Sequence, residues 1–201
     1  EARKELGLPN GVKTVLFVGN FVAVKGIDLL INACAWVNKR MVQPVKLVLI
    51  GTGELDHALQ DQTRSLGIDP LFAGRHNAAS VARHMQAADV VCLSSINEGV
   101  PNVLLEAMAC GTPVIASEVG GLGYLVQDGV TGYTVPDSAP EALCEKLSIL
   151  LGNSELRNEM GMKAAEYAND YAWEKITAAI IKVYEEVSTV HPIADIRPPQ
   201  A

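Results

Sequence analysis

Cysteine is scarce in this sequence and never occurs as a close pair. The four cysteines, Cys34, Cys92, Cys110 and Cys144, lie far apart along the 201 residues, and no C-x-x-C occurs. Zinc knuckles and redox dithiols are built from such closely spaced pairs, so neither is indicated. We expect reduced, mostly buried thiols, as in a protein of the cytosol.

Basic residues are outnumbered, with 16 Lys and Arg against 23 Asp and Glu, which gives a formal net charge of -7. Nucleic acids attract proteins through an excess of positive charge, so no nucleic-acid partner is expected. A phosphate group on any other ligand must therefore be bound by a local feature of the chain.

Long apolar runs are also missing. No stretch reaches the roughly 18 apolar residues that a membrane-crossing helix needs, and no signal peptide is visible. The expectation is a soluble, cytoplasmic protein. Its start at Glu1 without a methionine, in a short polar helix over 2–8, indicates a fragment of a longer protein. Membrane association is not evident here and is left to the missing part.

Short apolar runs alternate with stretches of helical periodicity, and 49% of the residues are hydrophobic, enough to bury a core as one domain. Continuous apolar character is typical of strands that are buried on both faces. Strands are expected over 14–19, 46–51, 90–93 and 114–116. Helices are expected over 27–40, 55–66, 79–87 and 103–110. This alternation predicts an α/β fold with a Rossmann-like, doubly wound parallel sheet.

The pattern becomes helical alone after residues 131–135. Further helices are expected over 140–151, 154–169 and 173–187, packed over the sheet or against a partner domain. Residues 191–201 contain three prolines and predict an extended or disordered tail. The chain is thus expected to form one domain over 1–190, followed by a tail over 191–201.

Loops that follow the strands are the places to look for a site, because ligands of doubly wound sheets bind at the carboxyl ends of the strands. The first such loop is GNFVAVKG, from Gly19 to Gly26, in which Lys25 precedes a glycine that opens a helix. Such a lysine can reach a phosphate held at a helix N-terminus, and a solvated lysine at a turn is an equally open interpretation. The loop is not a P-loop, because the G-K-[ST] ending is absent.

The second loop contains the pair Gly51 and Gly53. Glycines let the base or ribose of a nucleotide approach the backbone closely. Taken alone, this weak pattern favours a plain tight turn into the helix at Leu55 over a nucleotide contact.

The third loop carries two acids, Glu98 and Glu106. If Asn102 caps the following helix, Glu98 precedes that helix and Glu106 lies about one turn inside it. The helix end would then face a diphosphate, while the carboxylates accept hydrogen bonds from ribose and sugar hydroxyls. The alternative is that Glu106 only complements the helix dipole and Glu98 is a surface acid.

The stretch EGVPNVLLEAMACGTPVIAS closely resembles the E-x7-E region of the retaining GT-B glycosyltransferases of group 1, also called family four, and Glu98 and Glu106 match its two acids. The resemblance extends to about Val187. GNFVAVKG resembles the phosphate-binding loop, LVLIGTGEL the second-strand turn and GGLGYLVQDGVTGYTVP the closing loop, while LFAGRHNAASVARHMQAADVVCLSS resembles the base-binding loop with the helix and strand that follow. The chain is identified as the C-terminal, donor-binding domain, whose N-terminal partner domain is missing.

This resemblance implies a role for each candidate residue. Lys25 and Glu98 are the implied catalytic pair, with Lys25 on the donor diphosphate and Glu98 on hydroxyls of the transferred sugar, while Glu106 binds the ribose. Backbone amides from Gly99 to Val103 would face sugar and phosphate, and the base would be bound around Gly74 to His76. The complete donor-binding set is Gly19, Asn20, Lys25, Gly51, Gly53, Gly74, Arg75, His76, Glu98, Gly99, Val100, Asn102, Val103 and Glu106.

The resemblance further implies transfer of a hexose from a nucleoside-diphosphate sugar with retention of configuration. The sequence contains no D-x-D, and no metal and no cofactor are expected, because Lys25 and the helix dipole can stabilise the departing diphosphate. Since such chemistry takes place between two domains, this chain alone is expected to bind the donor without transferring the sugar.

Two positions depart from the family pattern. Asn20 stands where the family commonly has arginine, so one cation on the diphosphate is lost and weaker donor binding is expected. Gly123-Tyr124 replace the frequent Pro-Glu of the closing loop, which predicts a less rigid loop.

Three alternatives share some of these features. A GT-B phosphorylase half should carry a recognisable lysine for pyridoxal phosphate, and a sugar-nucleotide epimerase half is not expected to keep the E-x7-E segment. A non-catalytic, receiver-like nucleotide-binding module needs an acidic cluster at its strand ends, whereas the first strand here ends in Gly19-Asn20.

Overall fold

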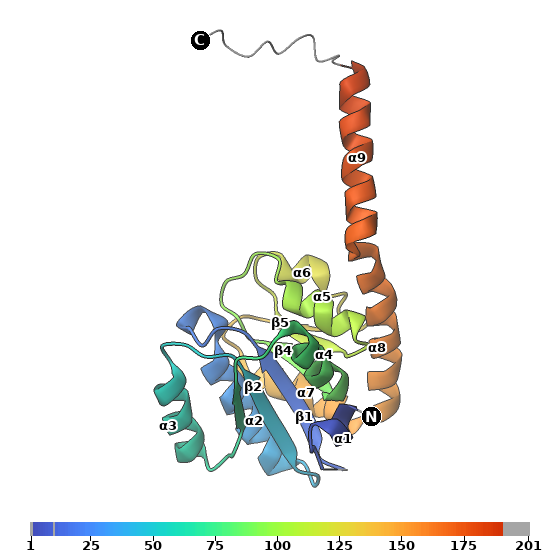
Figure 1. Cartoon of the computed structure of the whole chain (residues 1–201). Coiled ribbons are helices and arrows are strands. Elements are labelled where there is room, and N and C mark those ends of the chain that lie inside the picture. The colour runs from blue at the N-terminus through green and yellow to red at the C-terminus, as the bar shows by residue number, and fades with distance from the viewer. Residues whose placement is uncertain (1, 10, 191–201) are drawn as a thin grey trace, which may run out of the picture. The chain divides into compact units, whose positions relative to one another are not determined.

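The computed structural model describes residues 2–9 and 11–190 and divides the chain into two compact units, residues 1–168 and 169–201 (Figure 1). One domain over 1–190 was expected from the sequence. The tail expected over 191–201 lies outside the described residues.

The first unit is built on a six-stranded, wholly parallel sheet with the strand order β3-β2-β1-β4-β5-β6. Its strands are β1 (Lys13–Val18), β2 (Val45–Ile50), β3 (Leu71–Gly74), β4 (Val90–Leu93), β5 (Val114–Ser117) and β6 (Gly132–Val135). This is the strand order of a Rossmann fold, and the expected doubly wound α/β class is confirmed.

Strand β3 was not among the strands expected from the sequence. It is only four residues long, pairs with β2 alone, and leaves Leu71 42% exposed at the edge of the sheet. A short edge strand does not need the continuous apolar run by which the buried strands were found. β4 and β5, in contrast, are buried along their whole length.

Helices cover both faces of this sheet (Figure 1). They are α1 (Ala2–Glu5), the 3-10 turn η1 (Ala23–Lys25), α2 (Ile27–Arg40), α3 (Asp56–Leu66), α4 (Ala78–Ala87), α5 (Asn102–Ala109), α6 (Leu122–Leu125), α7 (Pro140–Gly152) and α8 (Ser154–Ala168). α2 packs against α3 and α7, whereas α4 packs against α1 and α5, and α5 packs against α8. Of the helices expected from periodicity, α2, α4 and α5 contact strands of the sheet that they connect, and α3 packs against α2.

The second unit contains η2 (Asn169–Tyr171) and α9 (Trp173–Val190). Apolar side chains recur along α9 at helical spacing, among them Trp173, Ile180, Val183 and Val187, and these are exposed. Within residues 2–9 and 11–190, no helix combines the length and the apolar character that crossing a membrane requires.

The cysteines lie in or beside the core. Cys34, Cys92 and Cys144 are buried and Cys110 is half-buried, and none of the four forms a disulfide. Burial raises the pKa of the Cys34, Cys92 and Cys110 thiols, which keeps them protonated and poorly nucleophilic. The expectation of mostly buried, unpaired thiols is confirmed.

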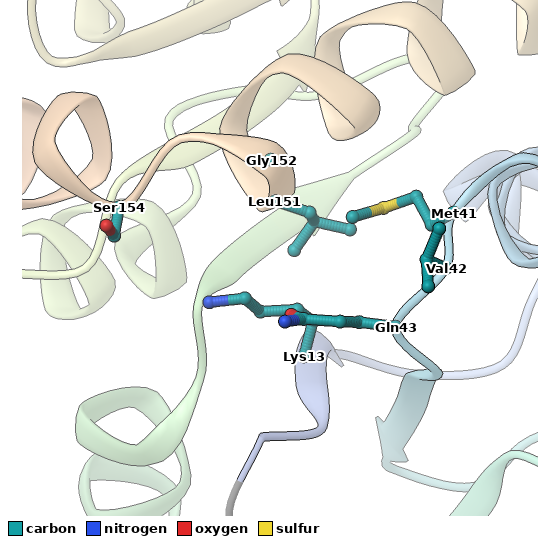
Figure 2. A pocket seen from close by; sticks show the side chains of 7 residues that line it. All are labelled: Lys13, Met41, Val42, Gln43, Leu151, Gly152 and Ser154. Carbon is teal, nitrogen blue, oxygen red and sulfur yellow. The ribbon is translucent and has the colours of Figure 1, made fainter.

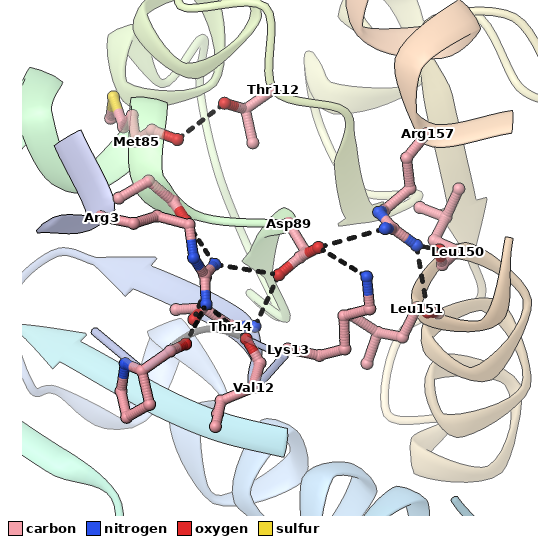
Figure 3. Close-up of polar contacts among 12 residues, drawn as sticks. Arg3, Val12, Lys13, Thr14, Met85, Asp89, Thr112, Leu150, Leu151 and Arg157 are labelled. Carbon is pink, nitrogen blue, oxygen red and sulfur yellow. Dashed lines mark hydrogen bonds and ion pairs between the residues drawn. The ribbon is translucent and has the colours of Figure 1, made fainter. Parts of the chain in front are cut away.

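Asp89, immediately before β4, is the centre of a charged cluster at the amino-terminal edge of the sheet (Figure 3). Its carboxylate lies 3.3 Å from Arg3, 3.3 Å from Lys13 and 3.2 Å from Arg157, and it accepts a 2.8 Å hydrogen bond from the Thr14 amide. Arg157 also donates to two carbonyl oxygens at the end of α7. One carboxylate thus connects α1, β1, β4 and α8 at the edge opposite the carboxyl ends of the strands.

Candidate functional site

A pocket of about 420 Å³ opens at the carboxyl ends of the central strands. In this sheet β1 lies between β2 and β4, so the order of the strands reverses there, which is the position where doubly wound sheets bind ligands. The pocket is lined by the loop after β1, the start of α4 and the start of α5, through Val18, Gly19, Asn20, Lys25, His76, Ala78, Val81, Pro101, Asn102, Val103 and Glu106.

Half of the fourteen residues predicted to bind the donor line this pocket. These are Gly19, Asn20, Lys25, His76, Asn102, Val103 and Glu106. The others, Gly51, Gly53, Gly74, Arg75, Glu98, Gly99 and Val100, lie outside the lining of the pocket. The fold therefore brings together residues from three separate loops, and Glu98 reaches this group through Lys25.

The loop that carries Lys25 is packed directly against the end of β4. Gly26 has φ +56°, and a Cβ atom at this position would lie 2.1 Å from the carbonyl oxygen of Ser94. The Ile96 amide donates a 2.8 Å hydrogen bond to the carbonyl of Val24. Only glycine combines that backbone conformation with such a close approach, so Gly26 determines where Lys25 lies.

Lys25 and Glu98 form an ion pair across the loops that follow β1 and β4. The ammonium nitrogen lies 2.5 Å from Oε1 of Glu98, and the Ser95 hydroxyl donates to the same oxygen at 2.7 Å. The two side chains are 23% and 10% exposed. The sequence predicted that these residues face different parts of a donor, and the structure shows that they contact one another.

Helix α5 begins differently from the sequence-based expectation. It starts at Asn102, its N-cap residue is Pro101, and no side chain caps it, so the expectation that Asn102 caps the helix is wrong by one residue. The fixed φ of proline suits the entry to a helix, which accounts for the shift. The first amides of α5 have no side-chain partner at the cap, and Glu106 lies exposed on the next turn, beside the pocket.

The glycines of the second loop have a packing role in this structure. A Cβ atom on Gly51 would lie 1.8 Å from the carbonyl oxygen of Gly19, and one on Gly53 would lie 2.3 Å from that of Phe21. Both glycines thus allow the loops after β1 and β2 to touch through their backbones. In this structure the backbone that approaches these glycines closely is that of the loop after β1, whereas the sequence suggested the base or ribose of a nucleotide.

The loop after β3 is held by several side-chain hydrogen bonds. Arg75 donates from Nε to the Thr52 hydroxyl at 3.0 Å. His76 contacts the Ala73 carbonyl through Nε2 at 3.1 Å and the Ser80 hydroxyl through Nδ1 at 2.7 Å. Because a carbonyl can only accept, Nε2 of His76 carries a proton.

In the described part of the chain, no group of three or more His, Cys, Asp or Glu side chains is arranged to hold a metal ion.

Four residues that sequence reasoning left out support the site. Ser94 and Ser95 follow β4 directly, and Gly120 and Gly121 lie against the segment that starts at Glu98. A Cβ atom on Gly120 would lie 1.9 Å from the Glu98 carbonyl oxygen, and the Gly121 amide donates to the Gly99 carbonyl at 3.1 Å. The sequence signal that could have indicated these residues is a pair of serines or glycines in the loop after a strand.

The closing loop is partly helical. Its residues 122–125 form α6, with Leu122 and Leu125 buried, although Gly123 and Tyr124 predicted a less rigid segment. Tyr167 of α8 donates its hydroxyl to the Tyr124 carbonyl at 3.2 Å. The two buried leucines and this hydrogen bond hold α6 against the rest of the first unit.

Another pocket, of about 310 Å³, opens at the opposite edge of the sheet (Figure 2). Met41 and Leu151 point toward one another in it, and Lys13 and Gln43 also line it. The Lys13 ammonium is paired with Asp89. None of the predicted site residues lies here, so the pocket at the carboxyl ends is the candidate site.

The family model described as Glycosyl transferases group 1 matches residues 1–167. This chain belongs to that family. A protein from Methanocaldococcus jannaschii that is described as an uncharacterized glycosyltransferase is 36% identical over 174 residues, which cover 86% of this chain and 48% of that protein. The chain thus spans about half the length of the curated relatives that it matches.

Solved structures of glycosyltransferases have the same fold. Sucrose-phosphate synthase from Thermosynechococcus elongatus aligns with a TM-score of 0.82 and 31% identity, over 94% of this chain and 49% of that one. The Anabaena protein HepE, solved in complex with UDP and glucose, aligns with a TM-score of 0.78 and 25% identity, over 93% of this chain and 51% of its own. The family thus rests on the match to residues 1–167, and these solved structures have the same fold as this chain.

Proposed function

We propose that this chain binds a nucleoside-diphosphate sugar and forms the donor side of a retaining hexosyltransferase. The observation that carries the proposal is the Lys25–Glu98 contact beside a pocket that also contains Glu106 and the start of α5. A cation, a helix N-terminus and two carboxylates are the groups that a diphosphate flanked by two polyols requires.

The diphosphate is assigned to Lys25 and to the first amides of α5. A phosphate at a helix N-terminus receives hydrogen bonds from backbone amides and a favourable dipole, and the ammonium adds a charge-assisted bond. As the bond between sugar and phosphate breaks, negative charge grows on the departing diphosphate. The Lys25 ammonium and the first amides of α5 can stabilise this charge, so the proposal includes no metal ion and no cofactor.

The polyol parts of the donor are assigned to the carboxylates. Glu106 is exposed beside the pocket and would accept from ribose hydroxyls, while Glu98 would accept from hydroxyls of the sugar. The base is assigned to the loop from Gly74 to His76, where Arg75 and His76 are already held by Thr52 and Ser80.

The complex of the relative HepE with UDP and glucose supports a nucleotide sugar as the donor. Because the chain covers about half of its relatives, we assign the acceptor, and any contact with a membrane, to a further domain outside this sequence. Transfer needs an oriented acceptor and exclusion of water, so this chain by itself would bind a donor without transferring the sugar.

Replacing Glu106 with glutamine tests the ribose assignment. The amide keeps the size of the side chain but loses its charge, and hydrogen bonds to charged groups contribute about 1.5–3 kcal/mol, so affinity should fall about tenfold. The loss should be equal for a nucleoside diphosphate and its sugar conjugate, because both contain the ribose. Calorimetric titration with UDP, GDP, ADP and their sugar conjugates measures it.

The matched control for Glu106→Gln is Glu155→Gln, an exposed glutamate in the first turn of α8. That variant should bind every nucleotide as the unmodified chain does. Unchanged affinity in Glu106→Gln, for a nucleotide that the unmodified chain binds, would show that the ribose is not bound by this carboxylate.

A further inference from the structure

Two consecutive serines, Ser94 and Ser95, follow the last residue of β4, and both are buried. The Ser94 hydroxyl donates to the Gly26 carbonyl at 2.7 Å, and it lies 3.3 Å from that of Lys25. The Ser95 hydroxyl donates to Oε1 of Glu98 at 2.7 Å. One dipeptide thus fixes the backbone at Lys25 and the carboxylate of Glu98, the two ends of the ion pair.

Both partners of the Glu98 carboxylate act on the same oxygen atom. Oε1 receives the Lys25 ammonium at 2.5 Å and the Ser95 hydroxyl at 2.7 Å. An incoming diphosphate competes with Glu98 for Lys25, because the ammonium is the one site group that both anions attract. When Lys25 turns to the phosphate, Ser95 is the partner that stays on Oε1.

We propose that Ser95 is a positioning residue: it holds Glu98 in place while Lys25 moves to the diphosphate, so that Oε2 accepts from a hydroxyl of the donor sugar. This inference rests on the proposed function and adds a positioning residue to the same site. Ser95 suits the role because its side chain is fully buried at a strand end and its donor atom does not depend on Lys25.

A loss of this hydrogen bond has a distinctive consequence. Without Ser95 and with Lys25 on the phosphate, the Glu98 carboxylate has no fixed orientation and must be ordered by the sugar itself, which weakens sugar binding. The nucleoside diphosphate lacks the sugar and does not need an oriented Glu98. A residue that only supports the fold would affect both ligands alike.

The experiment compares Ser95→Ala with the unmodified chain by calorimetric titration with UDP and with UDP-glucose, and with the GDP and ADP pairs. We expect affinity for the sugar conjugate to fall about fivefold, as for loss of one hydrogen bond, and affinity for the diphosphate to stay within about twofold. Ser95→Thr, which keeps the hydroxyl, should recover part of the loss. In a Glu98→Gln background, Ser95→Ala should have no comparable selective effect.

Ser117→Ala is the matched control, since Ser117 is a buried serine at the end of the neighbouring strand β5. It should bind both ligands as the unmodified chain does. Equal weakening of both ligands by Ser95→Ala, or no change in either, would overturn the positioning role alone. Failure of the unmodified chain to bind any diphosphate or sugar conjugate would overturn the proposed function, and this inference with it.

Discussion

Replacing Asp89 with alanine is expected to lower the free energy of unfolding by about 3–5 kcal/mol, the usual cost of breaking a buried ion pair from one side. The Asp89 side chain is 13% exposed and that of Arg157 is 9% exposed. The variant leaves Arg157, Lys13 and Arg3 without their shared anion, and the Thr14 amide without its acceptor. We expect the largest part of this loss to come from the Arg157 charge, because its side chain is the most buried of the three cations.

Chemical denaturation of the two proteins measures this difference, with Asp61→Ala as the control. Asp61 pairs with Arg64 on the surface of α3, where both side chains are about 70% exposed, and such pairs contribute little. Asp61→Ala should lower the free energy of unfolding by only a small fraction of the decrease caused by Asp89→Ala. Comparable losses in the two variants would contradict the structural role assigned to the Asp89 cluster.

Lys25→Met should weaken binding of a nucleoside diphosphate about 100-fold, or about 3 kcal/mol. Methionine keeps an unbranched side chain but removes the ammonium that we assign to the diphosphate. It also removes the cation that neutralises Glu98, whose side chain is 10% exposed, so an uncompensated negative charge then faces the phosphates. Both effects oppose binding of an anion, which makes this the most damaging single change proposed for the site.

Calorimetric titration with the diphosphate that binds best to the unmodified chain measures the effect. Lys39→Met is the control, because Lys39 lies on α2 in a separate pocket with Trp36 and Arg40 and should not affect affinity. The double variant Lys25→Met, Glu98→Gln should bind better than Lys25→Met alone, since the unpaired carboxylate is gone. Equal affinity of Lys25→Met and the unmodified chain would exclude Lys25 as a phosphate ligand.

Buried elements of the fold could be predicted from the sequence because burial on both faces imposes a continuous apolar run. β1, β2 and β4 were expected to within one residue of their observed bounds. β3 could not be found in this way, since one of its edges is free and its side chains are only partly buried. The N-cap position of Pro101 was missed because the capping preference of asparagine competes with the fixed φ of proline.

The candidate residues of the site could be predicted from the sequence, but the contacts between their side chains could not. Loops at strand ends drew attention to Lys25, Glu98 and Glu106, and a parallel sheet puts such loops at one edge. Lys25 and Glu98 are 73 residues apart in the sequence, and the pairing of β1 with β4 is what brings them together. The hydrogen bond from Ser95 depends on side-chain orientation at the end of β4, which no local pattern encodes.

Amide NMR of the isotope-labelled chain, titrated with UDP-, GDP- and ADP-glucose, locates the donor site residue by residue. For the donor that binds, we expect shifts concentrated in residues 19–26, 74–80 and 98–106, with Lys13, Gln43 and Ser154 at the opposite edge unaffected. Shifts that cluster at that opposite edge, or no shifts with any of the three donors at millimolar concentration, would contradict it.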